Sequence, residues 1–433
     1  MSAPALILAA PASASGKTTL TLALLRAYRK RGVRVASFKV GPDYIDPAFH
    51  AAASGLPCLN IDSWAMRPGT VAGIVSELGN DAELIVGEGV MGLFDGAAGG
   101  GGSTADVAAA LGLPVVLVQD VRGQWASAAA VIEGFANYRD DVTVAGAIFN
   151  RVASPRHAAL LQDACAGVAP VRLGAVPRDA CLSLPDRHLG LVQAGEHEAL
   201  DDFLDVAAEL VAAHVDLDAL AALARAPTVA AETCPPPPPL GQRIAIAEDT
   251  AFAFAYRHLC LTLQKQGVEL LPFSPLADEA PPPAADAVYL PGGYPELHAG
   301  RLAANSNFLD GLRAAAAGGA TVYGECGGYM VLGEGLVDGD GARHAMAGLL
   351  PLETAFAAPR LHLGYRQLVL AAATPLGPKG ARFRGHEFHY AEGTPGKAEA
   401  LFQASDSAGQ VLGPVGLRVG PVMGSFMHLV DAA

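Results

Sequence analysis

The chain has 433 residues, of which 51% are hydrophobic and 17% are charged. This length predicts two domains of roughly 200 residues each, and the composition is typical of a well-packed globular protein rather than a disordered one. The net charge of −14 argues against binding to nucleic acid or to an anionic membrane surface.

The cysteines and the N-terminal segment indicate a cytoplasmic protein. None of the six cysteines forms a C-x-x-C pair, which argues against a zinc knuckle or a disulfide framework and favours a reducing compartment. The apolar residues 3–10 have no basic segment before them and lead directly into Gly16 and Lys17, so we expect a buried strand there rather than a signal peptide. No window reaches the ~18 uninterrupted apolar residues of a membrane helix.

Short apolar runs alternate with amphipathic stretches in the first half of the chain. Such alternation predicts a mostly parallel sheet with helices on both faces. We expect the first helix over residues 18–31, because its basic end suits a helix C-terminus. The predicted strands are residues 6–10, 33–39, 83–86, 114–119 and 144–149.

Five consecutive prolines at 235–239 mark the clearest boundary in the chain. A proline run is extended and semi-rigid, and it cannot continue a helix or a central strand. The alternating pattern then restarts, so the sequence predicts two three-layer α/β domains in tandem. We expect the first domain over residues 1–226, a Pro-rich linker over 227–240 and the second domain over 241–433. Strands of the second domain are predicted at 243–247, 268–271, 287–291 and 320–323.

A phosphate-binding loop follows the first predicted strand. Residues 13–18 read Ser-Ala-Ser-Gly-Lys-Thr, although Pro11 stands where the full G-x-x-x-x-G-K-[ST] motif has its first glycine. Gly16 permits close backbone approach, Lys17 can reach the β- and γ-phosphates, and Thr18 can bind Mg²⁺. The alternative is a turn of small residues with a solvated lysine. The expected nucleotide-binding residues of this loop are Ser13, Ser15, Gly16, Lys17, Thr18 and Thr19.

Acidic residues follow two further predicted strands. Residues 39–47 read Lys-Val-Gly-Pro-Asp-Tyr-Ile-Asp-Pro, and Glu88 stands between two glycines. The carboxyl ends of parallel strands line the ligand crevice of a doubly wound sheet. We therefore expect Asp43, Asp46 and Glu88 to bind Mg²⁺ together with Thr18, because Mg²⁺ prefers oxygen ligands. Lys39 is expected to act in catalysis by neutralising the phosphoryl group during transfer. The alternative role for the aspartates is helix capping in a Pro-rich turn.

A glycine-rich loop follows Glu88. Within it, Asp95 is a weaker candidate ligand whose alternative role is to fix the loop. Residues 99–102 are all glycine, and the sequence favours neither a substrate lid nor a simple flexible connection there.

The second domain carries a cysteine on a sharp turn. Cys326 lies between a predicted strand and a helix predicted over 328–332, and three glycines surround it. This is the pattern of a nucleophile elbow, in which the side chain lies near a helix N-terminus that stabilises a thiolate. A buried structural cysteine is the alternative. The N–H groups expected to form an oxyanion hole are those of Gly292, Gly293 and Gly327.

These motifs resemble those of the cobyrinic acid and hydrogenobyrinic acid a,c-diamide synthases of cobalamin biosynthesis. The resemblance covers essentially the whole chain and is most specific in the run Gly-Pro-Asp-Tyr-Ile-Asp-Pro at 41–47. Residues 60–68 are more similar to the hydrogenobyrinic, aerobic-pathway branch, and Ala14 stands where the family commonly has glycine. The other matching stretches are residues 10–19, 88–96, 184–192, 291–296, 324–328, 385–390 and 424–429.

The resemblance implies an N-terminal domain like dethiobiotin synthetase and a C-terminal class I glutamine amidotransferase domain. In the relatives, ATP phosphorylates the a- and c-acetate carboxylates of the corrin ring, and ammonia released from glutamine then amidates them. ATP and Mg²⁺ are therefore the expected cofactors, and L-glutamine and hydrogenobyrinic or cobyrinic acid the expected substrates. We also expect a homodimer.

The resemblance also implies roles for individual residues. It places Asn150 and Arg151 beside the adenine, with strand-end capping as the alternative for Asn150, and it makes His428 the base for Cys326. Class I amidotransferases usually carry a glutamate two residues past this histidine, whereas Val430 stands there, so a Cys–His dyad is expected. The implied substrate-loop residues are Tyr44, Asp95, Arg187 and His188.

Three alternatives remain open for the function. One is a cobyric acid synthase, which amidates other side chains of the same ring. Another is a nucleotide-dependent switch of the septum-site or partition ATPase type, with no amidating role. The last is a glutamine-hydrolysing domain fused to an inactive kinase.

Overall fold

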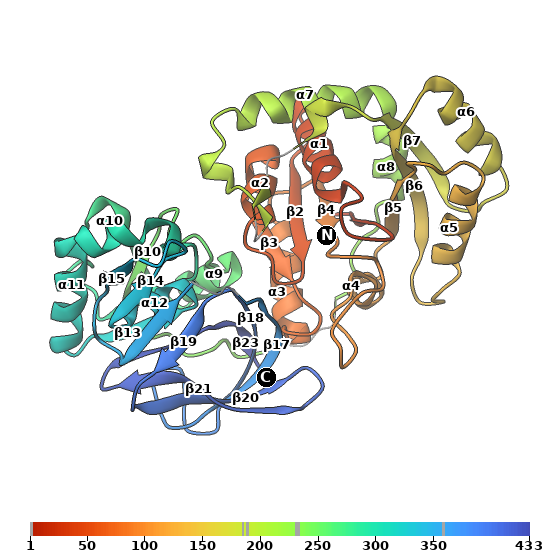
Figure 1. Ribbon diagram of the computed structural model, residues 1–433. Helices are drawn as coiled ribbons and strands as arrows, with labels where there is room; N and C mark the ends of the chain where they lie inside the picture. Colours follow the sequence, from red (N-terminus) through yellow and green to blue (C-terminus); the bar gives the residue numbers. More distant parts are fainter. Residues whose placement is uncertain (1–2, 184–185, 188–189, 230–233, 357–359) are drawn as a thin grey trace. The chain divides into compact units, whose positions relative to one another are not determined.

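The computed structural model describes residues 3–183, 186–187, 190–229, 234–356 and 360–433, and these form two compact units (Figure 1). The first unit comprises Met1–Trp64, Pro68–Gly96 and Gly101–Cys234, and the second comprises Ala65–Arg67, Ala97–Gly100 and Pro235–Ala433. We retain residues 227–240 as the proposed linker.

A seven-stranded sheet forms the centre of the first unit. Its order is β3-β2-β4-β1-β5-β6-β7, and all of its described pairings are parallel. Every residue of β1 to β4 is buried, as expected for a parallel sheet that is covered on both faces. The strands are β1 (Ala5–Ala9), β2 (Val35–Val40), β3 (Cys58–Ile61), β4 (Leu84–Glu88), β5 (Val115–Asp120), β6 (Val144–Val152) and β7 (Val171–Pro177).

Helices cover both faces of this sheet. Right-handed crossovers put α1 and α2 on one face and α3 to α6 on the other. Helix α7 packs against α1, and α8 packs against β6 and β7 (Figure 1). The helices are α1 (Lys17–Lys30), α2 (Asp46–Ser54), α3 (Pro68–Gly79), α4 (Thr104–Leu111), α5 (Ser127–Ala136), α6 (Pro155–Ala164), α7 (Leu200–His214) and α8 (Leu217–Leu223), and the shorter elements are η1 (Ala180–Leu182), β8 (Asp186–Arg187), β9 (Gly190–Leu191) and η2 (Ala194–Glu196).

A ten-stranded mixed sheet forms the centre of the second unit. Its order is β11-β10-β12-β13-β22-β21-β20-β17-β18-β23. Along this order, the pairings from β11 as far as β22 are all parallel. The pairings from β22 through β21, β20, β17 and β18 to β23 are all antiparallel. The strands are β10 (Arg243–Ala247), β11 (Glu269–Phe273), β12 (Ala287–Leu290), β13 (Thr321–Glu325), β17 (His362–Leu370), β18 (Arg382–His389), β20 (Glu399–Asp406), β21 (Val411–Val419), β22 (Val422–Ser425) and β23 (Met427–Ala432).

Helices and a second, smaller sheet complete this unit. The smaller sheet has the order β15-β14-β16-β19. The largest apolar cluster joins β12 and β13 to α11 and α12 through Leu290, Val322, Leu312 and Val331. The remaining elements are α9 (Arg257–Lys265), η3 (Pro275–Ala277), η4 (Pro295–His298), α10 (Ala299–Ala304), α11 (Ser306–Ala317), α12 (Gly327–Leu332), β14 (Gly335–Val337), β15 (Arg343–Ala345), β16 (Leu352–Ala355) and β19 (Glu392–Pro395).

The predicted elements agree with the parallel parts of both units. The expected strands are present with ends shifted by up to three residues, and the first helix begins at Lys17 rather than at residue 18. The strands that were not predicted are β3, β7, β22, the short β8 and β9, those of the smaller sheet, and the whole antiparallel half of the second unit. The antiparallel strands β17, β20 and β21 mix buried, half-buried and exposed residues, so they lack the continuous apolar run that marks a buried parallel strand.

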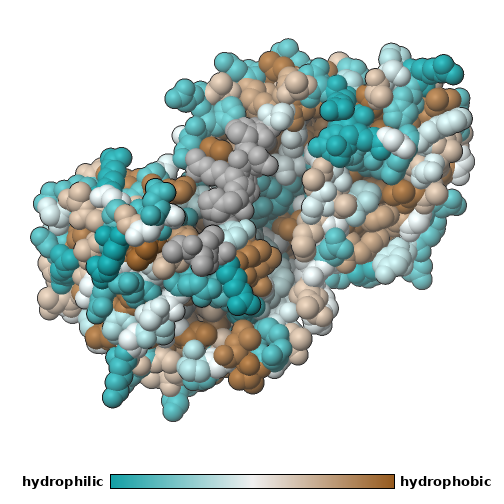
Figure 2. Space-filling model, in the orientation of Figure 1, coloured by the Kyte–Doolittle hydropathy of each residue, from teal (hydrophilic) through white to brown (hydrophobic). Residues whose placement is uncertain are grey.

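None of the helices in the described part of the chain combines the length and the apolar character needed to cross a bilayer. Figure 2 shows hydrophilic residues over much of one face, with hydrophobic residues interspersed among them, as is usual for a globular surface.

The packing of β7 generates a test of the first unit. A Cβ at Gly174 would lie 2.2 Å from the His214 carbonyl oxygen and 2.8 Å from Val215 Cα, which are backbone atoms that cannot rotate away. Gly174→Ala should therefore lower the free energy of unfolding by about 1–3 kcal/mol. The matched control is Gly134→Ala on exposed α5, where nothing lies within 4 Å of the new methyl group and helix propensity should raise stability by about 0.5–1 kcal/mol. Urea midpoints of the two variants would measure both effects, and equal midpoints would contradict the packing.

Candidate functional site

The phosphate loop joins β1 to α1 through a strained backbone. Gly16 has φ 87°, and a Cβ there would lie 2.3 Å from Asn150 Nδ2, so only glycine fits. Asn150 Nδ2 donates a hydrogen bond to the Ser15 carbonyl oxygen at 2.9 Å. Ala14 has φ 60°, a left-handed conformation that costs an alanine about 1–2 kcal/mol. Glycine would adopt this conformation without that cost.

The end of β6 braces the loop. Arg151 has φ 61°, and its Nη1 donates to the Ala14 carbonyl oxygen at 2.8 Å and to Asp120 Oδ2 at 2.5 Å. Asn150 and Arg151 therefore both contact the phosphate loop directly.

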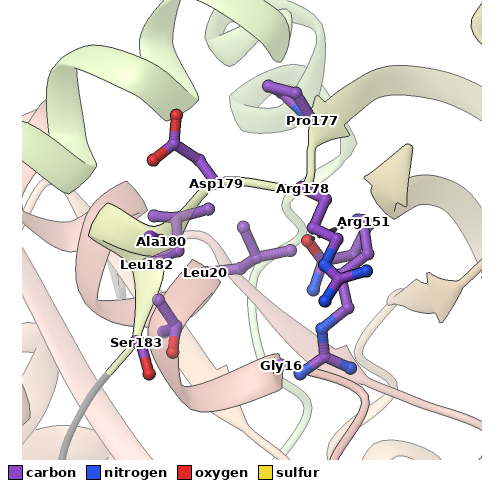
Figure 3. Close-up of a pocket in the computed structure, with 11 residues that line it drawn as sticks. Gly16, Leu20, Arg151, Pro177, Arg178, Asp179, Ala180, Leu182 and Ser183 are labelled. Carbon is purple, nitrogen blue, oxygen red and sulfur yellow. Dashed lines mark hydrogen bonds between the residues drawn. The ribbon is translucent and has the colours of Figure 1, made fainter. Parts of the chain in front are cut away.

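Two adjoining cavities lie beside the loop. One, of about 460 Å³, is lined by Asn150, Arg151 and the segment 177–183 (Figure 3). In Figure 3, Gly16, Arg151 and Arg178 lie along one side of this cavity, and Asp179, Ala180, Leu182 and Ser183 along the other. The second, of about 480 Å³, is lined by loop residues together with Lys39, Asp43 and Glu88. Both cavities share Gly16, Thr19, Arg151, Leu182 and Ser183, so they form one depression of the size that ligand sites have.

Carboxylates from β4 and α2 converge on Lys39 and Thr18. Lys39 Nζ donates to Asp46 Oδ2 at 2.6 Å and to Glu88 Oε1 at 2.7 Å. Thr18 Oγ1 donates to the same two oxygens, at 3.2 Å and 2.6 Å. His50 Nε2 lies 2.7 Å from Glu88 Oε2. Side chains from four elements therefore meet at the carboxyl ends of β2 and β4.

Electrostatic balance keeps this buried cluster charged. Burial acts to raise the pKa of Glu88, but the Lys39 and His50 side chains outweigh it and leave that pKa below its usual value. Burial acts to lower the pKa of Lys39, and the Asp46 and Glu88 carboxylates reverse this effect. Lys17, whose Nζ donates to the Met91 carbonyl oxygen at 2.5 Å, has its pKa lowered to about 8, chiefly by burial.

The two aspartates of the 39–47 run have different positions. Asp43 Oδ1 accepts hydrogen bonds from the Ile45 and Asp46 amides at 2.9 Å, so Asp43 caps the start of α2. Burial and the neighbouring Asp46 carboxylate raise the pKa of Asp43 to about 6. Asp43 lines the cavity that Glu88 lines, but of the two aspartates it is Asp46 that accepts hydrogen bonds from both Lys39 and Thr18, as Glu88 does.

The expected substrate-loop residues lie only partly within the described part of the chain. Asp95 is exposed, and its Oδ2 accepts from the Gly92 amide at 2.9 Å, so it fixes the loop. Tyr44 is half-buried next to Asp43. Arg187 belongs to β8, but its side chain and His188 lie outside the described residues.

Cys326 lies on a sharp turn between β13 and α12, as the sequence predicted. Its backbone has φ 47° and ψ −108°, which is a strained conformation for a residue with a side chain. A Cβ at Gly328 would lie 2.1 Å from the Leu290 carbonyl oxygen, and one at Gly327 would lie 2.7 Å from Pro295 Cδ. Glycines are therefore required on the helical side of the turn.

His428 and Gly292 adjoin the cysteine. A Cβ at Gly292 would lie 3.2 Å from Cys326 Cβ and 3.2 Å from His428 Nε2, so all three residues meet at one point. In the described part of the chain, neither Gly293 nor Gly327 donates its amide to another backbone carbonyl, and a Cβ at Gly327 would lie 3.1 Å from the Gly293 nitrogen. Two adjacent amides are thus available beside Cys326.

Burial sets the protonation of this pair. Cys326 is only 3% exposed, and burial raises the pKa of its thiol even though the Gly327 amide lowers it. Burial, with the nearby His386 and His389, lowers the pKa of His428 well below its usual value. A neutral thiol therefore lies beside a neutral imidazole, rather than the thiolate that the helix N-terminus alone would favour.

Sequence reasoning missed several polar residues around this site. Glu325 Oε2 lies 3.8 Å from His428 Nδ1. On β18, the His386 ring stacks on the His428 ring with centroids 4.9 Å apart, and Glu387 pairs with Arg366 at 2.8 Å and with His389 at 2.9 Å. The run Gly-His-Glu-Phe-His-Tyr at 385–390 was visible in the sequence, but its proximity to His428 depends on the antiparallel pairing of β18 with β23.

Comparison with known families matches both halves of the chain. Residues 6–192 match the CobQ/CobB/MinD/ParA nucleotide binding domain, so the first unit carries a nucleotide-binding domain. Residues 243–432 match the CobB/CobQ-like glutamine amidotransferase domain.

Several relatives that match over nearly their full length are named hydrogenobyrinate a,c-diamide synthase. Hydrogenobyrinate a,c-diamide synthase of Rhizobium meliloti is 56% identical, with 98% of this chain and 99% of that protein covered. The synthase of Brucella anthropi is 55% identical, with 98% of each chain covered. That of Mesorhizobium japonicum is 49% identical over the full length of both. The chain therefore belongs to the family of the hydrogenobyrinate a,c-diamide synthases.

Proposed function

We propose that this chain uses ATP and glutamine to amidate the a- and c-acetate carboxylates of hydrogenobyrinic acid. The observation that carries the proposal is the presence, on one chain, of a phosphate loop facing a charged oxygen cluster and of a strained cysteine beside a histidine. The first arrangement suits phosphoryl transfer, and the second suits nucleophilic release of ammonia. Full-length relatives named for this activity support the choice of substrate.

The second unit would release ammonia. Cys326 Sγ attacks the side-chain carboxamide carbon of glutamine while neutral His428 accepts the thiol proton. The Gly293 and Gly327 amides, which lie side by side, stabilise the oxyanion that forms. His428 then protonates the departing nitrogen, leaving ammonia and a γ-glutamyl thioester on Cys326. Water hydrolyses the thioester to glutamate and restores the thiol.

The first unit would activate the carboxylate. A carboxylate oxygen of the substrate attacks the γ-phosphorus of ATP, ADP departs, and an acyl phosphate remains. Lys17 and Lys39 bring positive charge to the cavity that would hold the phosphates, which stabilises the charge of the transferring phosphoryl group. Ammonia then attacks the acyl carbon and displaces phosphate, which leaves the amide.

The oxygen cluster suits a divalent cation. Thr18 Oγ1 lies 3.2 Å from Asp46 Oδ2 and 2.6 Å from Glu88 Oε1. Lys39 Nζ lies 2.6 Å and 2.7 Å from the same two carboxylate oxygens. Mg²⁺ prefers such oxygen donors. We propose that Thr18, Asp46 and Glu88 would hold it, and that Asp43 acts mainly as a helix cap. When bound, Mg²⁺ would neutralise the β- and γ-phosphates. We further propose that the enzyme acts as a homodimer in the cytoplasm.

Removing the thiol should separate the two half-reactions. Cys326→Ser should lower glutamine-driven amidation by roughly 10³-fold or more, because a serine hydroxyl is less acidic and a weaker nucleophile than a thiol. It should leave amidation from free ammonia near the wild-type rate. Mass spectrometry of the tetrapyrrole product, after incubation with hydrogenobyrinic or cobyrinic acid, would count the amides. Loss of the ammonia reaction with survival of the glutamine reaction would refute the assigned role.

Removing the loop lysine should stop both reactions. Lys17→Ala deletes a buried cation of the phosphate cavity and should lower amidation from either nitrogen source by roughly 10²-fold or more. Glutamine hydrolysis measured without ATP should be unaffected. The matched control, Lys397→Ala, removes an exposed lysine of the second unit and should leave both rates unchanged. A Lys17→Ala variant with full ammonia-driven activity would contradict the proposed nucleotide site.

The two aspartates should respond differently when their charge is removed. Asp46→Asn takes away an oxygen charge at Thr18 and Lys39 and should raise the Mg²⁺ concentration for half-maximal activity by roughly tenfold or more. Asp43→Asn keeps an oxygen that can cap α2 and should shift this Mg²⁺ concentration less. Magnesium titrations of ammonia-driven amidation measure both values. A larger shift for Asp43→Asn would reverse the two roles.

A further inference from the structure

The residue two positions past His428 cannot orient its imidazole. Val430 has an apolar side chain, and its backbone carbonyl oxygen lies 3.1 Å from His258 Nε2. A base that receives a thiol proton needs its other ring nitrogen held by an acceptor, which fixes the tautomer and stabilises the cation that forms. The acceptor must therefore come from elsewhere in the fold.

Glu325 is a buried carboxylate at the end of β13, directly before Cys326. Its Oε1 accepts from the Tyr323 hydroxyl at 2.8 Å and from the Leu429 amide at 3.1 Å, and its Oε2 accepts from the Tyr289 hydroxyl at 2.9 Å. All three bonds are donated to the carboxyl group, as suits its ionised form. Burial nevertheless raises the pKa of Glu325 to about 7.

The His428 ring lies between this carboxylate and the cysteine. Its Nδ1 is 3.8 Å from Glu325 Oε2. Its Nε2 and Cε1 lie at the opposite side, where a Cβ on Gly292 would be 3.2 Å and 2.4 Å from them and 3.2 Å from Cys326 Cβ. Nε2 is thus the ring nitrogen on the side of Gly292 and Cys326 Cβ, and Nδ1 is the ring nitrogen on the side of the carboxylate.

We infer that Glu325 is the positioning residue of the ammonia-releasing site and completes a Cys326–His428–Glu325 triad. The carboxylate favours the tautomer with its proton on Nδ1, which leaves the Nε2 lone pair free to accept the proton of Cys326. It then stabilises the imidazolium until Nε2 passes that proton to the departing ammonia. Glu325 remains ionised throughout. This inference rests on the proposed roles of Cys326 and His428.

A purely structural role is the competing explanation, because the same carboxylate joins β12, β13 and β23. The two roles predict different pH profiles. The groups that face Glu325 include Tyr289 on β12, Tyr323 on β13, the adjacent Cys326 thiol, whose pKa is raised, and His428 and the Leu429 amide on β23. Both hydroxyls have pKa values raised well above their usual range, and the pKa of His428 is lowered well below its own. Glu325 is the group of this set that titrates near pH 7, and its active, ionised form predominates above that pH.

The test is Glu325→Gln in the full chain, which keeps the shape and removes the charge. Glutamine hydrolysis should lose roughly 10²-fold or more in kcat with KM little changed, and ammonia-driven amidation should be preserved. The wild-type kcat should rise as pH increases through about 7, and this rise should be absent from Glu325→Gln. Glu325→Asp retains the charge and should recover part of the lost rate. The control is Glu399→Gln, at a partly exposed ion pair with Arg418, which should behave as wild type.

The possible results are distinguishable. An unchanged kcat and pH profile in Glu325→Gln would overturn the inference while leaving the proposed function intact. An equal loss of glutamine- and ammonia-driven activity would also overturn it, because it would show a structural role. A wild-type chain without glutaminase activity would overturn the proposed function, and this inference with it.

Discussion

Strained backbone at the ends of parallel strands is the constraint on which both sites depend. Among the described residues, five that are not glycine have positive φ, and four of them belong to the sites: Ala14, Met91, Arg151 and Cys326. Each follows or ends a strand of a parallel sheet, where the chain must turn sharply and present polar atoms at the sheet edge. A conformation of this kind persists only where the surrounding packing enforces it.

The packing that enforces these turns differs between the two units. In the first, polar contacts brace the loop, because Asn150 and Arg151 donate to the Ser15 and Ala14 carbonyl oxygens. In the second, close backbone contact fixes the turn, because a side chain at Gly328 would overlap the Leu290 carbonyl group. Hydrogen bonds can be rearranged when a charged ligand enters, whereas backbone contact cannot. The first solution therefore suits a loop that binds phosphates, and the second suits a nucleophile that must keep its position.

The sequence predicted what is encoded locally. The buried strands β1, β4 and β5 begin with continuous apolar runs, and β2 is apolar apart from Ser37 and Lys39. The glycines around Lys17 and Cys326 mark turns that other residues could not adopt. The antiparallel strands lack such a run because their buried residues are interspersed with half-buried and exposed ones. The choice between Asp43 and Asp46 was also beyond the sequence, since both are acidic residues at one strand end. It depends on which carboxylate caps α2, a matter of side-chain rotamer and of contacts to distant residues.

The third member of the proposed triad illustrates the same limit. A rule based on spacing looks for a glutamate two residues past the histidine and finds Val430, so it predicts a dyad. Glu325 is about a hundred residues away along the chain, but the Leu429 amide donates to its carboxylate and thereby ties β23 to the end of β13. The chemistry requires only a hydrogen-bond acceptor near His428 Nδ1. This acceptor can come from any strand that lies close enough to the ring. A residue that neighbours the nucleophile can therefore take over the role of one that neighbours the base.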